Sequence, residues 1–112
     1  MIDTSVILRM TDALQENVIA KTELDSIKLA LTKLIELKEQ EIVKIDNEIL
    51  ENHCNNISSV FTSYKIDQLN EQIISLKIKN RENNDSLAVI NDNIQTIVIR
   101  LTYYLNNHFI NN

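Results

Sequence analysis

His53 and Cys54 are the side chains of this sequence best suited to hold a metal or act as a nucleophile, and they are neighbours in the segment ENHCNNISS, residues 51–59. A zinc site needs three or four ligands, and the only other histidine, His108, lies far along the chain. A catalytic cysteine needs a base and a third residue that orients the base, and no such set is apparent. We therefore expect no metal, no cofactor and no catalytic residue, and interpret this segment as a turn.

The elements on either side of that turn follow from the composition. The 112 residues include no glycine and no proline, which removes the usual residues of tight turns and helix ends. The absence of glycine also excludes a phosphate-binding glycine loop. Because Leu, Lys, Glu and Gln favour helix, the composition predicts an all-α protein. Catalytic side chains usually lie on loops around a cleft, and this chain has one short loop, so we expect that it is not an enzyme.

The first half of the chain has the apolar spacing of a long amphipathic helix. Apolar residues recur at steps of mostly three and four, with Lys38 as a polar exception: Ile7, Met10, Leu14, Val18, Leu24, Ile27, Leu31, Leu34, Ile42, Ile45 and Ile49. No strong helix breaker interrupts this pattern, so we expect one helix over about residues 3–51. The alternative is that residues 2–20 form a separate third helix that folds back over the C-terminal part.

The second half carries a more regular pattern, a heptad sustained from Ile66 to His108. Its positions follow alternating steps of three and four: Ile66, Leu69, Ile73, Leu76, Asn80, Asn83, Leu87, Ile90, Ile94, Ile97, Leu101, Tyr104 and His108. We expect a second helix over about residues 60–107, after a turn at residues 52–59. The chain would then be a single helical domain, residues 1–112, built as a long antiparallel helical hairpin or coiled-coil-like bundle of two to three helices.

Two asparagines interrupt the apolar character of this heptad, Asn80 and Asn83. Either the segment RENNDS is a loop that ends the helix, or the helix continues and the asparagines lie in its seam. The continuous heptad phase favours the second interpretation. A seam asparagine lowers stability but fixes the register of pairing, so we expect Asn80 and Asn83 to specify register.

The C-terminal part of the second helix has more apolar residues than one seam needs. Val89, Val98, Ile99 and Tyr103 lie outside the heptad positions, and one apolar stripe is enough for packing in a hairpin. We expect a partner protein, a second copy of the chain or the third helix to cover this surface. The residues expected to bind a partner helix are Leu87, Ile90, Ile94, Ile97, Val98, Leu101 and Leu105.

Charge and hydropathy exclude other partners. The net charge is −5 and no cluster of lysines or arginines is present, so we expect no binding of nucleic acid. The apolar window SLAVINDNIQTIVIRLTYYL includes Asp92, Arg100 and several amides, which excludes a transmembrane helix. A single cysteine and no signal-peptide pattern predict a reducing, cytoplasmic location.

The segment LNEQIISLKIKNRENNDSLAVINDNIQTIVIRL, residues 69–101, resembles the C-terminal half of FlgN-type flagellar export chaperones. That family carries a leucine-rich segment, an asparagine-containing signature and then an apolar amphipathic helix. The matching residues are Leu76, Asn80, Asn83 or Asn84, and Leu87, followed by Ile90, Ile94, Ile97 and Leu101. The segment LALTKLIELKEQEIVKID is similar to the long helix of the family's first half.

This resemblance implies a cytoplasmic chaperone of type III secretion in the flagellum. Such a chaperone binds the C-terminal helices of hook-filament junction proteins, prevents their premature polymerisation and delivers them to the export apparatus. The alternative is a structural coiled-coil subunit of a larger scaffolding or tethering complex. A prefoldin-like hairpin is disfavoured, because such hairpins join their helices through β-strands for which residues 51–59 leave no room.

Overall fold

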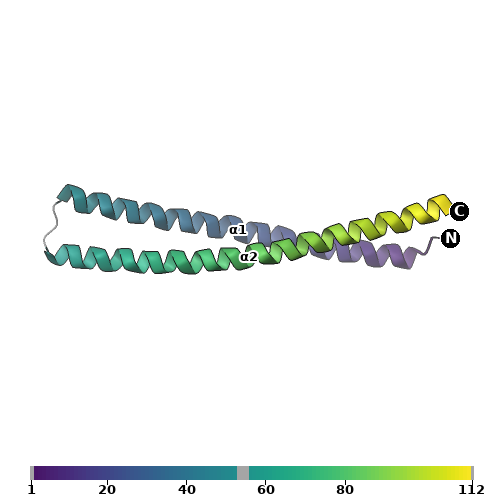
Figure 1. The fold of residues 1–112 in the computed structure, drawn as a ribbon, viewed down its shortest axis with the longest axis horizontal. Helices are drawn as coiled ribbons and strands as arrows, with labels where there is room; N and C mark the ends of the chain where they lie inside the picture. Colours follow the sequence, from purple (N-terminus) through teal and green to yellow (C-terminus); the bar gives the residue numbers. More distant parts are fainter. Residues whose placement is uncertain (1, 53–55, 112) are drawn as a thin grey trace. The chain divides into compact units, whose positions relative to one another are not determined.

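The computed structural model describes residues 2–52 and 56–111, and nearly all of them are helical. Helix α1 spans Thr4–Asn52 and helix α2 spans Asn56–Asn111 (Figure 1). The two helices run in opposite directions, and the described residues include no strand. The prediction of an all-α helical hairpin is confirmed.

The bounds of α1 agree with the sequence to within a residue, whereas α2 is longer than predicted. It begins at Asn56 and ends at Asn111, so residues 56–59, predicted as part of the turn, are helical. Serine and asparagine favour helix caps but have only a modest helix penalty, so the polar stretch overstated the length of the turn. His53 and Cys54 lie outside the described residues.

The structure also decides between the alternatives for helix number. Residues 4–52 form one helix, so the separate third helix of residues 2–20 is wrong. The segment RENNDS lies inside α2, so the loop interpretation of residues 81–86 is also wrong. With no glycine or proline at either place, nothing in the sequence interrupts the backbone hydrogen bonds.

The hairpin contains two compact units, and each helix contributes to both. The terminal unit contains residues 2–26 and 83–111 of the described chain, and the central unit contains the described residues between 27 and 82. In each unit a segment of α1 packs against a segment of α2.

A cap closes the N-terminal end of α1. Oδ1 of Asp3 accepts hydrogen bonds from the backbone N of Ser5 at 3.0 Å and from its Oγ at 2.7 Å. The carbonyl of Asp3 accepts from the backbone N of Val6 at 3.1 Å. These bonds satisfy N–H groups that have no partner within the helix, and the backbone N of Asp3 donates to the hydroxyl of Tyr104 on α2 at 3.0 Å.

The heptad predicted for α2 is confirmed position by position. Every heptad residue from Ile66 to His108 is buried or half-buried, and each residue between these positions from 63 to 103 is exposed. The pattern holds because the side chains on one face of a helix follow steps of three and four. One face of α2 therefore packs against α1 along both units.

The predicted seam of α1 is correct only in part. Val18, Ile27 and Leu34 are exposed, with 45%, 47% and 45% of their surface accessible. Polar residues take inward positions instead: Asn17 and Lys21 are half-buried, as is the predicted exception, Lys38. An apolar pattern misses seam positions that are polar, as at Asn17 beside Val18. It also does not choose between two apolar neighbours, as at Leu34 and the half-buried Ile35.

Candidate protein-binding site

The seven residues predicted to bind a partner lie in the terminal unit, and most of them belong to its internal seam. Leu87 is buried with 7% of its surface accessible. Ile90, Ile94, Ile97, Leu101 and Leu105 are half-buried, and only Val98 is exposed, at 43%. Apart from Val98, these residues help to join α2 to α1, and their contact with a partner stays a prediction.

Asn83 has a specific contact in the seam of the terminal unit. It is 8% exposed, and its Nδ2 donates to the backbone carbonyl of Leu24 at 3.0 Å. A shift of α2 along α1 would move this buried amide away from its acceptor, at a cost of about 1 to 3 kcal/mol. This geometry supports a register-specifying role for Asn83.

Asn80, one turn earlier on α2, has the opposite environment. It is half-buried in the central unit, and its Oδ1 is buried without a hydrogen-bond partner in the described part of the chain. A buried acceptor without a partner destabilises the helix pair. The structure therefore distinguishes the two asparagines. Of the two, only Asn83 makes a hydrogen bond to α1 that would be lost if the helices shifted relative to one another.

The terminal unit exposes the apolar residues that the sequence placed outside the heptad. Val89, Ile99 and Tyr103 have accessible fractions of 58%, 60% and 69%. On α1, Leu8, Val18 and Ile19 are exposed as well. The predicted excess of apolar surface in this part of the chain is confirmed.

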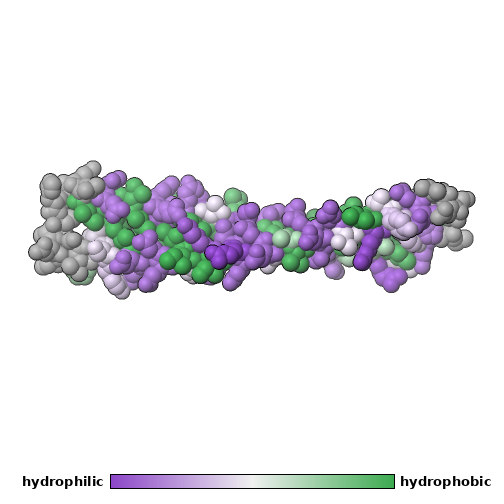
Figure 2. Space-filling model, in the orientation of Figure 1, coloured by the Kyte–Doolittle hydropathy of each residue, from purple (hydrophilic) through white to green (hydrophobic). Residues whose placement is uncertain are grey.

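The central unit exposes even more large apolar side chains, which the sequence reasoning missed. They are Ile27, Leu29, Leu34, Leu37, Val43, Phe61, Tyr64, Ile74 and Ile78. Figure 2 shows apolar areas on the visible face separated by polar ones. The signal was present in the sequence, because Leu29, Val43 and Ile74 also lie outside the seam spacing. The apolar excess is therefore not confined to the C-terminal part of α2.

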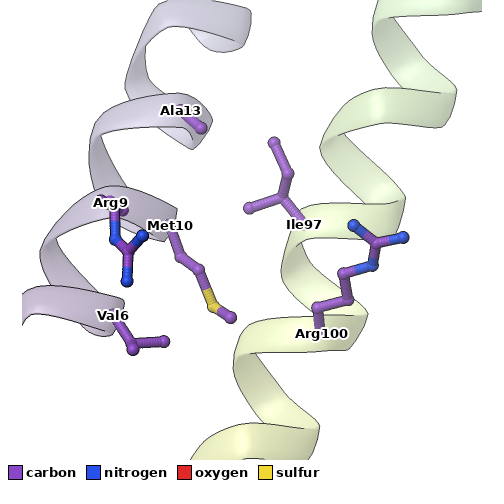
Figure 3. A pocket seen from close by; sticks show the side chains of 6 residues that line it. All are labelled: Val6, Arg9, Met10, Ala13, Ile97 and Arg100. Atoms are coloured by element: carbon purple, nitrogen blue, oxygen red, sulfur yellow. The ribbon is translucent and has the colours of Figure 1, made fainter. Parts of the chain in front are cut away.

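A shallow hollow of about 280 Å³ lies between the two helices of the terminal unit (Figure 3). Val6, Met10 and Ala13 line it from α1 and Ile97 lines it from α2. The side chains of Met10 and Ile97 point into the space between the helices, and an arginine stands on each helix beside this space. These arginines are Arg9 and Arg100. The hollow thus combines an apolar floor with two cations.

A second hollow, of about 270 Å³, lies within the central unit. Its lining includes Leu34 and Leu76 with two cations, Lys38 and Lys79. Here Nζ of Lys38 already donates to Oε1 of Gln72 at 2.7 Å. One of the two lysines beside this hollow is therefore already engaged in a contact between the helices.

Ion pairs between the helices occur in the central unit. Nζ of Lys65 lies 3.6 Å from Oε1 of Glu41, and Nζ of Lys77 lies 3.6 Å from Oε1 of Glu39. All four side chains are largely exposed, so each pair contributes at most about 1 kcal/mol. They align charges across the hairpin but contribute little stability.

The described part of the chain offers little for metal chemistry. No three His, Cys, Asp or Glu side chains gather there in an arrangement that could hold an ion. His108 instead packs beside Tyr104 on the same helix, with ring centroids 4.4 Å apart. Among the described helices, none has a stretch long and apolar enough to cross a bilayer.

Comparison of the chain with known protein families, curated proteins and solved structures finds no match.

Proposed function

We propose that this chain is a binding module for helical segments of partner proteins. One observation carries the proposal: the described residues include only four buried apolar side chains, whereas sixteen large apolar side chains are exposed. The buried ones are Ile45, Leu69, Ile73 and Leu87. A two-helix hairpin with so small a core has much apolar surface left to bury.

The energetics favour a helix as the covering element. Burying one Leu, Ile, Val or Phe side chain completely contributes about 1.5 to 3 kcal/mol, so covering even a few exposed ones would support specific binding. Grooves between packed helices accept the apolar face of an added helix, whose side chains recur at the same three- and four-residue steps. The proposal includes no catalytic activity and no cofactor.

The specific role we propose is that of a cytoplasmic export chaperone. Its clients would be the C-terminal helices of hook-filament junction proteins, which it would deliver to the type III export apparatus. The support is the resemblance of residues 69–101 to FlgN-type chaperones, together with the continuity of α2 through the asparagine-containing signature. In that role the chaperone covers a client's coiled-coil surface with its own exposed apolar residues.

A structural coiled-coil subunit is the second candidate, and the distribution of exposed residues favours it. Nine of the sixteen exposed large apolar side chains lie in the central unit and seven in the terminal unit. A client that covered only the C-terminal part of α2 would leave the nine exposed. Permanent assembly with other helices would cover both units.

Size-exclusion chromatography with light scattering tests the two candidates. The purified chain is measured alone and mixed with a C-terminal helical fragment of a flagellar hook-filament junction protein. For the export chaperone we expect a soluble chain that forms a 1:1 complex with the fragment. A matched fragment whose seam leucines are replaced by glutamine should not shift the elution, because it lacks the apolar stripe.

Two other outcomes would contradict the export role. A stable self-oligomer that ignores the fragment would favour the structural subunit, since its apolar surface would already be covered by copies of itself. A stable monomer that binds neither this fragment nor any other amphipathic helix would overturn the binding-module proposal itself.

A further inference from the structure

The two arginines beside the hollow of the terminal unit make few contacts within the described chain, although the charge of Arg9 adds to the hydrogen bonds from Ser5 in lowering the pKa of the Asp3 carboxyl. Nε of Arg9 donates only to the carbonyl of Ser5 at 3.4 Å, and Arg100 makes no hydrogen bond or ion pair with any described residue. Neither lies in an ion pair with a carboxylate of the described chain, although the sequence has sixteen Asp and Glu.

Arginine is also scarce in this protein, which makes its placement informative. The chain contains three arginines, and two of them stand beside this one hollow. The third, Arg81, lies on α2 in the central unit and lines neither hollow described above. An apolar floor with arginines at its edge is typical of protein-binding surfaces, because the guanidinium pairs with carboxylates while its stem packs on apolar side chains.

The floor has the dimensions of a helix face. Val6, Met10 and Ala13 follow each other at steps of four and three along α1, so the floor extends about 10 Å along that helix. An incoming helix presents apolar side chains with the same repeat. The other hollow is less suited to a charged partner, because Lys38 beside it already donates to the side chain of Gln72. By contrast, no described side chain accepts a hydrogen bond from Arg9 or Arg100.

We propose that the hollow formed by Val6, Arg9, Met10, Ala13, Ile97 and Arg100 binds an acidic amphipathic helix of a partner protein. The partner's apolar side chains would fill the floor, and Asp or Glu side chains flanking them would pair with Arg9 and Arg100. This inference rests on the proposed function and adds the charge that the bound helix carries. It also runs against the net charge of the protein, since a chain of −5 attracts cationic partners in general.

The net charge and the two arginines therefore predict opposite preferences, which two peptides of opposite charge distinguish. Two 21-residue helical peptides of equal helicity are titrated into the full chain at low salt, followed by calorimetry. Both have leucines at heptad seam positions, one with glutamates and the other with lysines at the flanking positions. We expect the glutamate peptide to bind about tenfold more tightly or better, and its affinity to fall with added salt because exposed charge pairs are screened.

A pair of double variants locates the site. Arg9→Gln with Arg100→Gln should weaken binding of the glutamate peptide about fivefold, as expected for two exposed ion pairs. Lys79→Gln with Arg81→Gln removes the same amount of charge from the central unit and should change the affinity less than about twofold. Both doubles replace exposed residues, so we expect the hairpin itself to stay folded, which circular dichroism checks.

The methionines supply a readout at the floor itself. The chain has two, Met1 and Met10, so a sample labelled at the methionine methyl groups gives two signals, assigned with Met10→Leu. We expect the Met10 signal to shift when the glutamate peptide binds. A bound peptide that leaves this signal unmoved, or that ignores the arginine variant, would place the site elsewhere and overturn the inference.

The remaining outcomes separate this inference from the proposed function. Equal binding of the two peptides would overturn the preference for acidic helices while supporting helix binding. Preference for the lysine peptide would mean that net charge dominates, which also overturns it. Binding of neither peptide by a monomeric chain would overturn both proposals, and light scattering that shows a dimer with the Met10 methyl already covered would replace the partner with a second copy of the chain.

Discussion

The central unit and the terminal unit join the same two helices with different side chains. In the central unit the seam buries three aliphatic residues, Ile45, Leu69 and Ile73, and lysine–glutamate pairs lie outside it. In the terminal unit the seam buries one aliphatic residue, Leu87, and one amide, Asn83. We infer that the first arrangement favours stability and the second favours a defined register.

The terminal unit contains further polar contacts that involve asparagine side chains. Nδ2 of Asn17 donates to the carbonyl of Ala13 within α1 at 2.7 Å, and Nδ2 of Asn93 on α2 reaches Oδ1 of Asn17 at 3.5 Å. Such hydrogen bonds add little net stability, since water offers equivalent partners to the separated helices. We infer that the terminal unit opens more easily than the central unit, as a region that exchanges partners requires.

Replacing a buried leucine in each unit should have the largest effect on the free energy of unfolding. Leu69 in the central unit and Leu87 in the terminal unit are 6% and 7% exposed. We expect Leu69→Ala to lower the free energy of unfolding by about 3 kcal/mol and Leu87→Ala by about 2 kcal/mol. The cost is larger at Leu69 because the cavity left there is lined by aliphatic neighbours, which lose packing contacts. Urea denaturation followed by circular dichroism measures both.

A larger loss for Leu87→Ala than for Leu69→Ala would reverse the comparison. It would mean that the terminal unit holds the hairpin together. Leu29→Ala serves as the control, because Leu29 is 74% exposed and its truncation should cost less than about 0.5 kcal/mol.

Replacing the seam asparagines is the next largest effect. Asn80→Leu with Asn83→Leu should raise the free energy of unfolding by about 1 kcal/mol or more, because it removes a buried acceptor without a partner and adds apolar packing. For a chain of this size the melting temperature should rise by about 4 to 8 °C. Light scattering should at the same time reveal a broader distribution of oligomers, since the register contact to Leu24 is lost.

Asn84→Leu is the matched control for the asparagine variants. Asn84 is the exposed neighbour of Asn83, so its replacement should leave the melting temperature and the oligomeric state nearly unchanged. If the double seam variant is no more stable than the wild type and equally monodisperse, the asparagines do not specify register.

The cap at Asp3 should have a smaller and pH-dependent effect. Hydrogen bonds from the side chain and backbone of Ser5 hold the pKa of the Asp3 carboxyl below its usual value of 3.8. Because this pKa is lower in the folded chain, the carboxylate stabilises α1 above the unfolded pKa, and this contribution is lost as pH falls through the folded value.

Two variants check this direction. Asp3→Ala should lower the melting temperature at neutral pH, and its difference from the wild type should shrink as pH falls to about 2. Asp3→Asn keeps a capping oxygen without a charge, so its capping contribution should not change over that pH range. A constant difference between Asp3→Ala and the wild type down to that pH would show that the charged form contributes nothing.

The exposed ion pairs of the central unit should contribute least. Lys65→Met removes the pair with Glu41, and we expect a change in the free energy of unfolding of less than about 0.5 kcal/mol, further reduced in high salt. Urea denaturation at low and high salt measures it. A loss above about 1 kcal/mol would mean that charge, and not the aliphatic seam, holds the central unit together.

Much of the fold was predictable, because the features that determine it are local and periodic. Every heptad position from Ile66 to His108 lies in the seam of α2, although the heptad did not include the half-buried Leu105, and the lack of glycine and proline explains why each helix is continuous. On α1 the seam position Asn17 is polar, so the sequence favoured its neighbour Val18 wrongly. At residues 34 and 35 both candidates are apolar, and the sequence favoured Leu34 although Ile35 is the half-buried one.

The candidate site was less predictable for a different reason. Sequence spacing indicates which residues share a helix face, but it does not reveal which residues of the other helix they meet. The hollow between Met10 and Ile97, and the presence of both Arg9 and Arg100 beside it, depend on the alignment of α1 with α2. The contact from Asn83 to Leu24, which lies in the same unit, joins positions 59 residues apart.

Hydrogen–deuterium exchange of the whole chain, alone and saturated with the glutamate peptide, tests the central claim most directly. We predict that amides of residues 87–105 exchange faster than those of residues 62–80 in the free chain, and that the peptide slows the former about tenfold or more. Equal exchange in the two units of the free chain, with no slowing on addition of the peptide, would contradict the claim that the terminal unit is the part left open for a partner helix.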